Sequence, residues 1–224
     1  MRGHIQIHRF LPALTYRNYR NLWLASICSQ SAAWALIVGR GALALTLTNS
    51  PFWTAIVTFS ALIPSVLVAP FAGVLADRFD RRTVLAWAYG VNLAQTLLLA
   101  LLVLFQIIEP WHLVMLALVN GSARATQIPT TQALLPNTIP KERLFNGVAL
   151  YQTAHHGSKF IGPLLILFVL WTTGRESSVF FVCTGLYVAS LVCLSNIDTV
   201  SRGIIVSGKG LIIGNLLAGL KYVY

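Results

Sequence analysis

The chain has 224 residues, of which 56% are hydrophobic and only 10% are charged. Soluble domains carry about 25% charged residues, so this composition excludes an ordinary soluble enzyme and favours a protein that lies in lipid. A formal net charge of +10 would suggest a nucleic-acid partner on a soluble protein. Here the basic residues cluster in short segments between long apolar stretches, which indicates membrane topology and no nucleic-acid partner.

Six apolar stretches are each close to or above the roughly 20 residues that a helix needs to cross a bilayer. They predict spans over residues 21–47, 52–75, 83–108, 111–135, 147–171 and 179–194. The short loops between the spans make neighbouring helices antiparallel and pack them into one bundle. The predicted fold class is therefore an all-α membrane protein with six transmembrane helices, filling residues 21–195.

The distribution of Lys and Arg predicts the orientation of the bundle. Twelve of the 16 fall on one side of the membrane, one (Arg175) falls in a loop on the other side, and three lie inside spans. The positive-inside rule then places both chain ends in the cytoplasm. Residues 1–20 become a cytoplasmic N-terminal segment, and residues 196–224 a cytoplasmic linker helix region.

Polar side chains occur at helical spacing inside the first, fourth and fifth spans. Ionisable groups there cost about 2.5–3.5 kcal/mol each on insertion scales, so they mark solute pathways or structural pairs. The candidates for a substrate pathway are Arg40, Asn120, Arg124, Gln127, Gln152, His156 and Lys159. His155 and His156 are also the candidates for proton coupling, because their side chains titrate near neutral pH; a packed, hydrogen-bonded role is the alternative.

The three charges inside the spans differ in depth and share one sign. Arg124 and Lys159 lie near the midplane, where snorkelling is difficult; a water-filled cavity and a structural pair both remain open. Arg40 lies only about seven residues from the outer end, so it could instead snorkel to that interface. All three are cations and no Asp or Glu lies deep in a span, which favours an anionic solute or acidic partners from elsewhere.

The loop after the second span has the sequence Gly-Val-Leu-Ala-Asp-Arg-Phe-Asp-Arg-Arg over residues 73–82. It resembles the signature loop of the major facilitator superfamily, with Asp80 where the general pattern has glycine. This variant resembles the branch that contains the enterobactin exporter and related effluxers. The resemblance implies a conformational-switch loop that holds the cytoplasmic side together through Gly73, Asp77, Arg78, Arg81 and Arg82.

Other segments extend the resemblance along most of the chain. Residues 17–23 are similar to the basic, aromatic entry of the family's first span. Gly157, Gly162 and Pro163 lie where family exporters carry the antiporter signature, although the first glycine is one residue early. Residues 210–224 look like the linker helix that leads to a seventh span, so we expect a form truncated before that span.

The resemblance implies the N-terminal half-bundle of the major facilitator fold and a secondary active transporter in the bacterial inner membrane. It would export a small, anionic or siderophore-like solute by alternating access. Its partners would be the lipid bilayer, the solute, and a second half-transporter or a C-terminal half. A non-transporting remnant of a split or truncated gene is the alternative. The sequence has no enzyme motif and no metal-ligand spacing, so we expect no catalysis, metal or cofactor.

Overall fold

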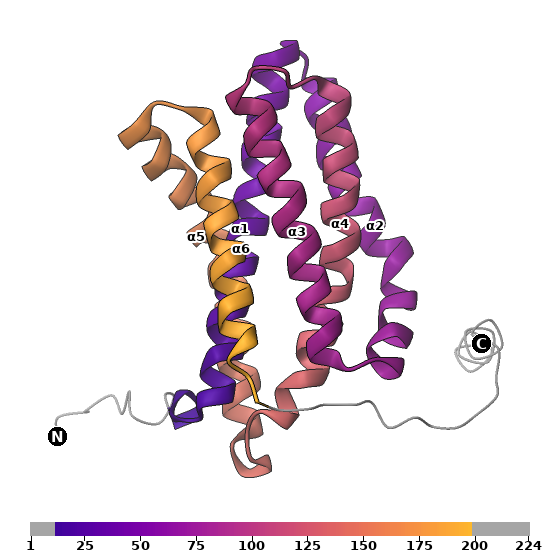
Figure 1. Cartoon of the computed structure of the whole chain (residues 1–224), viewed down its shortest axis with the longest axis vertical. Helices are drawn as coiled ribbons and strands as arrows, with labels where there is room; N and C mark the ends of the chain where they lie inside the picture. Colours follow the sequence, from indigo (N-terminus) through magenta and orange to yellow (C-terminus); the bar gives the residue numbers. More distant parts are fainter. Residues whose placement is uncertain (1–11, 199–224) are drawn as a thin grey trace, which may run out of the picture.

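The computed structural model describes the backbone of residues 12–198 and the side chains of residues 13–68 and 79–198. Six long helices run side by side through this part of the chain (Figure 1). They are α1 (Arg17–Thr48), α2 (Pro51–Arg78), α3 (Arg81–Leu104), α4 (Pro110–Leu134), α5 (Leu144–Thr173) and α6 (Glu176–Ser195). Three short 3₁₀ turns complete it, η2 (Pro12–Thr15), η3 (Leu135–Asn137) and η4 (Lys141–Arg143). The all-α fold is confirmed, since residues 12–198 contain no strand.

The six predicted spans correspond to the six long helices, of which α4 is less apolar than the other five. Among the described helices, five are long and apolar enough to cross a membrane, and α4 is not one of them. α4 nevertheless has 25 residues and lies alongside α3 and α2 (Figure 1). Its low hydropathy comes from polar residues that it buries inside the bundle, including Asn120, Gln127, Thr130 and Thr131. An average over the helix cannot distinguish this buried polar face from a water-facing one.

The third predicted span ends four residues too late. α3 stops at Leu104 because Gln106 adopts a left-handed φ of 58°. The backbone N–H of Ile107 donates to the carbonyl of Leu102 at 3.1 Å, and that of Gln106 to Val103 at 3.2 Å. These two bonds form a Schellman motif, which satisfies the last carbonyls of a helix and turns the chain out of it.

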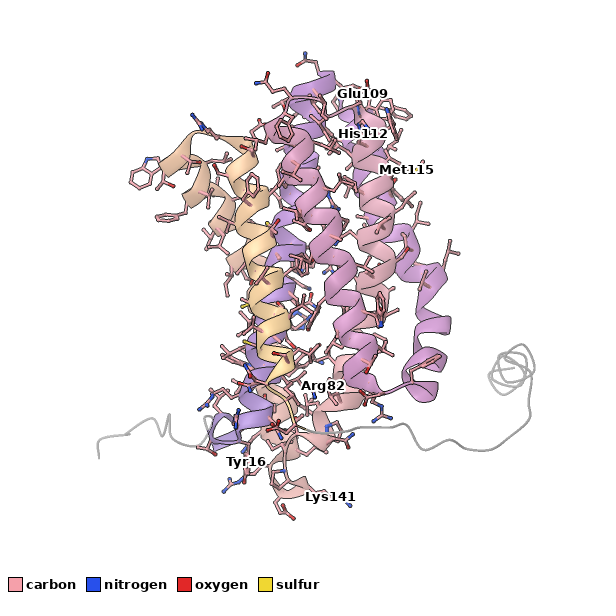
Figure 2. All side chains as sticks on the ribbon, in the orientation of Figure 1. Tyr16, Arg82, Glu109, His112, Met115 and Lys141 are labelled. Carbon is pink, nitrogen blue, oxygen red and sulfur yellow. The ribbon has the colours of Figure 1, made fainter. Side chains whose placement is uncertain are left out.

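The two ends of the bundle are chemically different. Figure 2 places Tyr16, Arg82 and Lys141 at one end, and Glu109, His112 and Met115 at the other. The first group belongs to the segments predicted to face the cytoplasm. The bundle therefore brings together three basic or aromatic loops that are far apart in the sequence, as antiparallel neighbours require.

The interior is layered along the helix axes. One apolar cluster contains Leu36, Leu113 and Phe180, and a second, nearer the Tyr16 end, contains Leu22 and Leu85. Buried polar side chains lie between the two clusters along α1, α3, α4, α5 and α6. We call them the polar layer: Ser29, Gln30, Asn92, Gln95, Asn120, Gln127, Ser158 and Ser190.

Two glycines allow the closest helix crossings. A Cβ placed on Gly121 of α4 would collide with the carbonyl oxygen of Ala61 in α2 and lie 3.1 Å from its carbonyl carbon. A Cβ on Gly162 of α5 would lie 2.6 Å from the carbonyl oxygen of Ser31 in α1. Small residues at such crossings let helix backbones approach in membranes. The pairs α2–α4 and α1–α5 therefore fix how the helices surround the polar layer.

Substitution of Gly121 by alanine tests the α2–α4 crossing. We expect Gly121→Ala to destabilise the protein by about 1–3 kcal/mol, because the rigid Ala61 backbone has to move. Gly185→Ala is the control, since a Cβ there has no neighbour within 4 Å; it should be neutral or stabilising by up to about 1 kcal/mol. Thermal unfolding of the purified protein in detergent measures both. Equal stability of the two variants would contradict the close crossing.

Candidate functional site

Arg124 of α4 and Lys159 of α5 meet on one aromatic ring, that of Trp34 in α1. The guanidinium carbon of Arg124 lies 4.8 Å from the ring centroid, and Nζ of Lys159 lies 5.5 Å from it. Both distances are within the roughly 6 Å range of a cation–π contact. The two cations that the sequence placed near the midplane therefore share one site, although they are 35 residues apart in the chain.

The shared ring makes this pair of like charges tolerable. Both charges lie within 5.5 Å of the Trp34 centroid, so they are less than about 11 Å apart. At that separation two unit charges repel by about 1.5 kcal/mol at an effective dielectric constant of ~20. Two cation–π contacts worth about 0.5–2 kcal/mol each offset this repulsion. No carboxylate of the described residues pairs with either cation.

Several neutral polar groups lie one helical turn from this cation pair. Gln30 precedes Trp34 by four residues, Gln127 follows Arg124 by three, and His155 precedes Lys159 by four, so all three lie toward the Tyr16 end. Oε1 of Gln30, both amide atoms of Gln127 and Nδ1 of His155 are enclosed without a hydrogen-bond partner in the described structure. These groups add unused hydrogen-bonding capacity to a cationic site. We call Trp34, Arg124, Lys159, Gln30, Gln127 and His155 the cation site.

The other fifth-helix candidates lie beside the cation site. The ring of His155 stacks near Tyr151, with centroids 6.3 Å apart, and meets His156 edge-on at 5.4 Å. His156 is exposed and Gln152 is half-buried. His155 is therefore the more buried of these two histidines.

Arg40 lies in a separate, buried hydrogen-bond network. Only 1% of its surface is exposed, so its side chain does not reach the outer interface, and Nη2 donates to Oε1 of Gln95 in α3. Gln95 donates in turn to the hydroxyl of Thr96 at 2.6 Å and to the carbonyl of Asn92 at 3.1 Å. Asn120 of α4 donates to Oδ1 of Asn92 at 2.6 Å. The two pathway candidates Arg40 and Asn120 thus join α1, α3 and α4 inside the bundle.

Part of the predicted switch loop caps helices. Arg81 donates to the carbonyl of Ala133 at 2.8 Å, in the last turn of α4, and Arg82 to that of Ser195 at 2.7 Å, where α6 ends. Cations at helix C-termini satisfy free carbonyls and oppose the helix dipole. Asp80, the departure from the family pattern, is the N-cap of α3 and accepts from the backbone N–H of Thr83 at 3.1 Å. Figure 2 shows Arg82 at the Tyr16 end of the bundle.

The structure describes the antiporter-like motif but not the remaining side chains of the switch loop. The surroundings of Gly73 and the side chains of Asp77 and Arg78 lie outside the described residues. So do residues 1–11 of the predicted N-terminal segment and residues 199–224 of the predicted linker. Gly162 packs directly against α1, where its Cβ would meet Cβ of Trp34 at 2.9 Å. A Cβ added at Gly157 would have no neighbour within 4 Å, and Pro163 lies inside α5. Gly162 of this motif thus lets α5 pack against Trp34, the residue that both cations contact.

Sequence reasoning missed Trp34, Gln30 and Gln95. Trp34 lies in an apolar span and gives no polar signal, since an aromatic residue there ordinarily packs or contacts lipid. Gln30 and Gln95 could have been found, because uncharged amides in a span are unusual and each lies on the buried face of its helix. Within residues 12–198 no cluster of His, Cys, Asp and Glu could hold a metal, and the three cysteines are free.

Long apolar helices around a buried polar layer define a multi-pass membrane protein. A family model described as transmembrane secretion effector, of the major facilitator type, matches residues 10–224. The chain belongs to this family, whose members are transporters and not enzymes.

Curated relatives agree with this assignment. The staphyloferrin A transporter of Staphylococcus aureus is 24% identical over 72% of this chain, and the uncharacterized MFS-type transporter YfiS of Bacillus subtilis is 27% identical over 67% of it. Macrolide efflux protein A of Streptococcus pyogenes is 21% identical over 55%. The chain aligns with 41%, 35% and 31% of the lengths of these relatives, respectively.

Removal of the Gln95 side chain tests the buried network. Gln95→Leu takes away the acceptor of an enclosed guanidinium and should destabilise the protein by about 1.5–3 kcal/mol. The double variant Arg40→Leu with Gln95→Leu should recover part of that loss, because no buried charge is then left without a partner. Unfolding by sodium dodecyl sulfate in mixed micelles measures Gln95→Leu, Arg40→Leu and the double variant. Strictly additive losses would show that the two side chains do not interact.

Proposed function

We propose that this transporter is a secondary active exporter of a small anionic, siderophore-like solute, which it moves by alternating access. The observation that carries the proposal is the cation site, where Arg124 and Lys159 share Trp34 and no described carboxylate neutralises them. A cationic site enclosed by low-dielectric walls concentrates anions. Two relatives each support one part of the proposal, since one is named as a staphyloferrin A transporter and another as a macrolide efflux protein.

The positions of the cations favour a solute pathway over a purely structural pair. A structural pair inside a membrane protein joins a cation to an acid or to backbone carbonyls. Arg124 and Lys159 instead contact an aromatic ring, and their N–H groups donate to no residue of the described part. Eight donors, five on a guanidinium and three on an ammonium, therefore remain for carboxylate or catecholate oxygens.

Alternating access would use the chain as one rigid unit that rocks against a second six-helix unit. Hydrogen bonds from side chains to backbone tie the helices at the Tyr16 end: Tyr19 to Gly147 at 2.8 Å, Trp23 to Leu150 at 3.2 Å, and Arg82 to Ser195. We propose that this end faces the cytoplasm of a bacterial inner membrane, with the switch loop at the contact between the two units. His155 would supply the proton-coupling group.

Vesicle transport with charge-removing variants tests the proposal. Proteoliposomes containing the full chain should exchange radiolabelled citrate across the membrane and should not move ethidium, because the cation site attracts anions and repels cations. Arg124→Gln and Lys159→Gln should each lower citrate exchange at least tenfold. Arg175→Gln is the matched control, since Arg175 is exposed in a loop outside the spans and its loss should leave exchange unchanged.

Two results would contradict the proposal. Transport of ethidium and not of citrate would reject an anionic solute. Absence of exchange of any solute by folded protein would favour a non-transporting role for this chain.

A further inference from the structure

The two cations of the cation site are close enough to act on one molecule. Both charges contact the same indole ring, so they are less than about 11 Å apart. Arg124 and Lys159 come from different helices, α4 and α5, and no hydrogen bond joins their side chains. The ring of Trp34, on α1, makes a cation–π contact with both. The ring is therefore placed to influence the separation of the two charges.

The packing around Trp34 makes its ring a fixed reference point. Cβ of Trp34 faces Gly162, where an added Cβ would lie at 2.9 Å, so α5 packs on the base of this side chain. Nε1 is enclosed and makes no hydrogen bond with a described residue, which leaves the faces of the ring as its contact surfaces. A ring held at its base by a helix crossing has few alternative positions.

We propose that Trp34 is a positioning residue that holds Arg124 and Lys159 as one divalent anion site, so that the site selects solutes with two carboxylate groups over solutes with one. This inference rests on the proposed function, because it assigns a substrate class to the same site. The ring holds the two cations together against their repulsion before the solute arrives. A dicarboxylate then meets both charges at once, whereas a monocarboxylate gains from only one.

Removal of the ring should therefore change selectivity and not simply stability. Without Trp34 the cations repel and separate, and a dicarboxylate has to draw them together. The affinity for the dicarboxylate should fall about tenfold, while that for a monocarboxylate should change little. A residue that merely filled space would lower both affinities together. The ratio of the two affinities is thus the informative quantity.

The experiment measures that ratio by calorimetry on the full chain in lipid nanodiscs. The probes are linear dicarboxylates from succinate to suberate, each compared with its monoamide, which has almost the same size and one charge less. The variants are Trp34→Leu, which removes the ring, and Trp34→Phe, which keeps a weaker one. Trp171→Leu is the matched control, because Trp171 is 84% exposed on α5 and lies outside the cation site.

We expect the unmodified protein to bind at least one dicarboxylate ten or more times tighter than its monoamide. Trp34→Leu should reduce this preference to about twofold or less, Trp34→Phe should lie between, and Trp171→Leu should match the unmodified protein. An unchanged preference in Trp34→Leu, or no preference in the unmodified protein, would overturn the role of Trp34 and leave an anionic solute in place. Binding of no member of the series would reject the proposed function and this inference with it.

Discussion

The structure depends on how polar side chains are kept inside a bundle that lies in hydrocarbon. A polar group has no water to bond in the bilayer core, so a partner on another helix is what makes it tolerable. The polar layer meets this requirement between α3 and α4, where Asn120 bonds Asn92, and between α1 and α3, where Arg40 bonds Gln95. The two apolar clusters lie on either side of the polar layer along the helix axes. The helices are thus held together by the same kind of residues that make α4 less apolar than the other five long helices.

Polar groups in this bundle have two separate roles. The Arg40 network is enclosed and joined to itself, which is typical of residues that fix the register and orientation of helices. Enclosed donors without a partner occur in both places, among them Nε and Nη1 of Arg40. The difference lies in what surrounds each cation: an amide acceptor on Gln95 for Arg40, and the face of an aromatic ring for Arg124 and Lys159. The proposed solute site rests on the second arrangement.

Much of this could be predicted from the sequence, and the failures have physical causes. Six helices were predicted near their observed bounds, because apolar length and short loops are local properties. The end of α3 was misplaced because the Schellman motif uses Gln106 in a left-handed conformation, which favours glycine. Asp80 was treated as a departure from a motif, whereas it caps α3. The side-chain contacts of Gly73, Asp77 and Arg78 stay predictions.

The sequence by itself determined that the chain is a helical membrane protein, the family to which it belongs, and the presence of three cations within its spans, because length, hydropathy and charge are local. The tertiary structure decided what each cation contacts. Helical spacing predicts which residues share a face, but not which face of another helix lies opposite. The packing of α5 and α4 against α1 places Lys159 and Arg124 against Trp34, whereas α3 brings Gln95 to Arg40. Those contacts join residues far apart in the chain, so packing alone could select them.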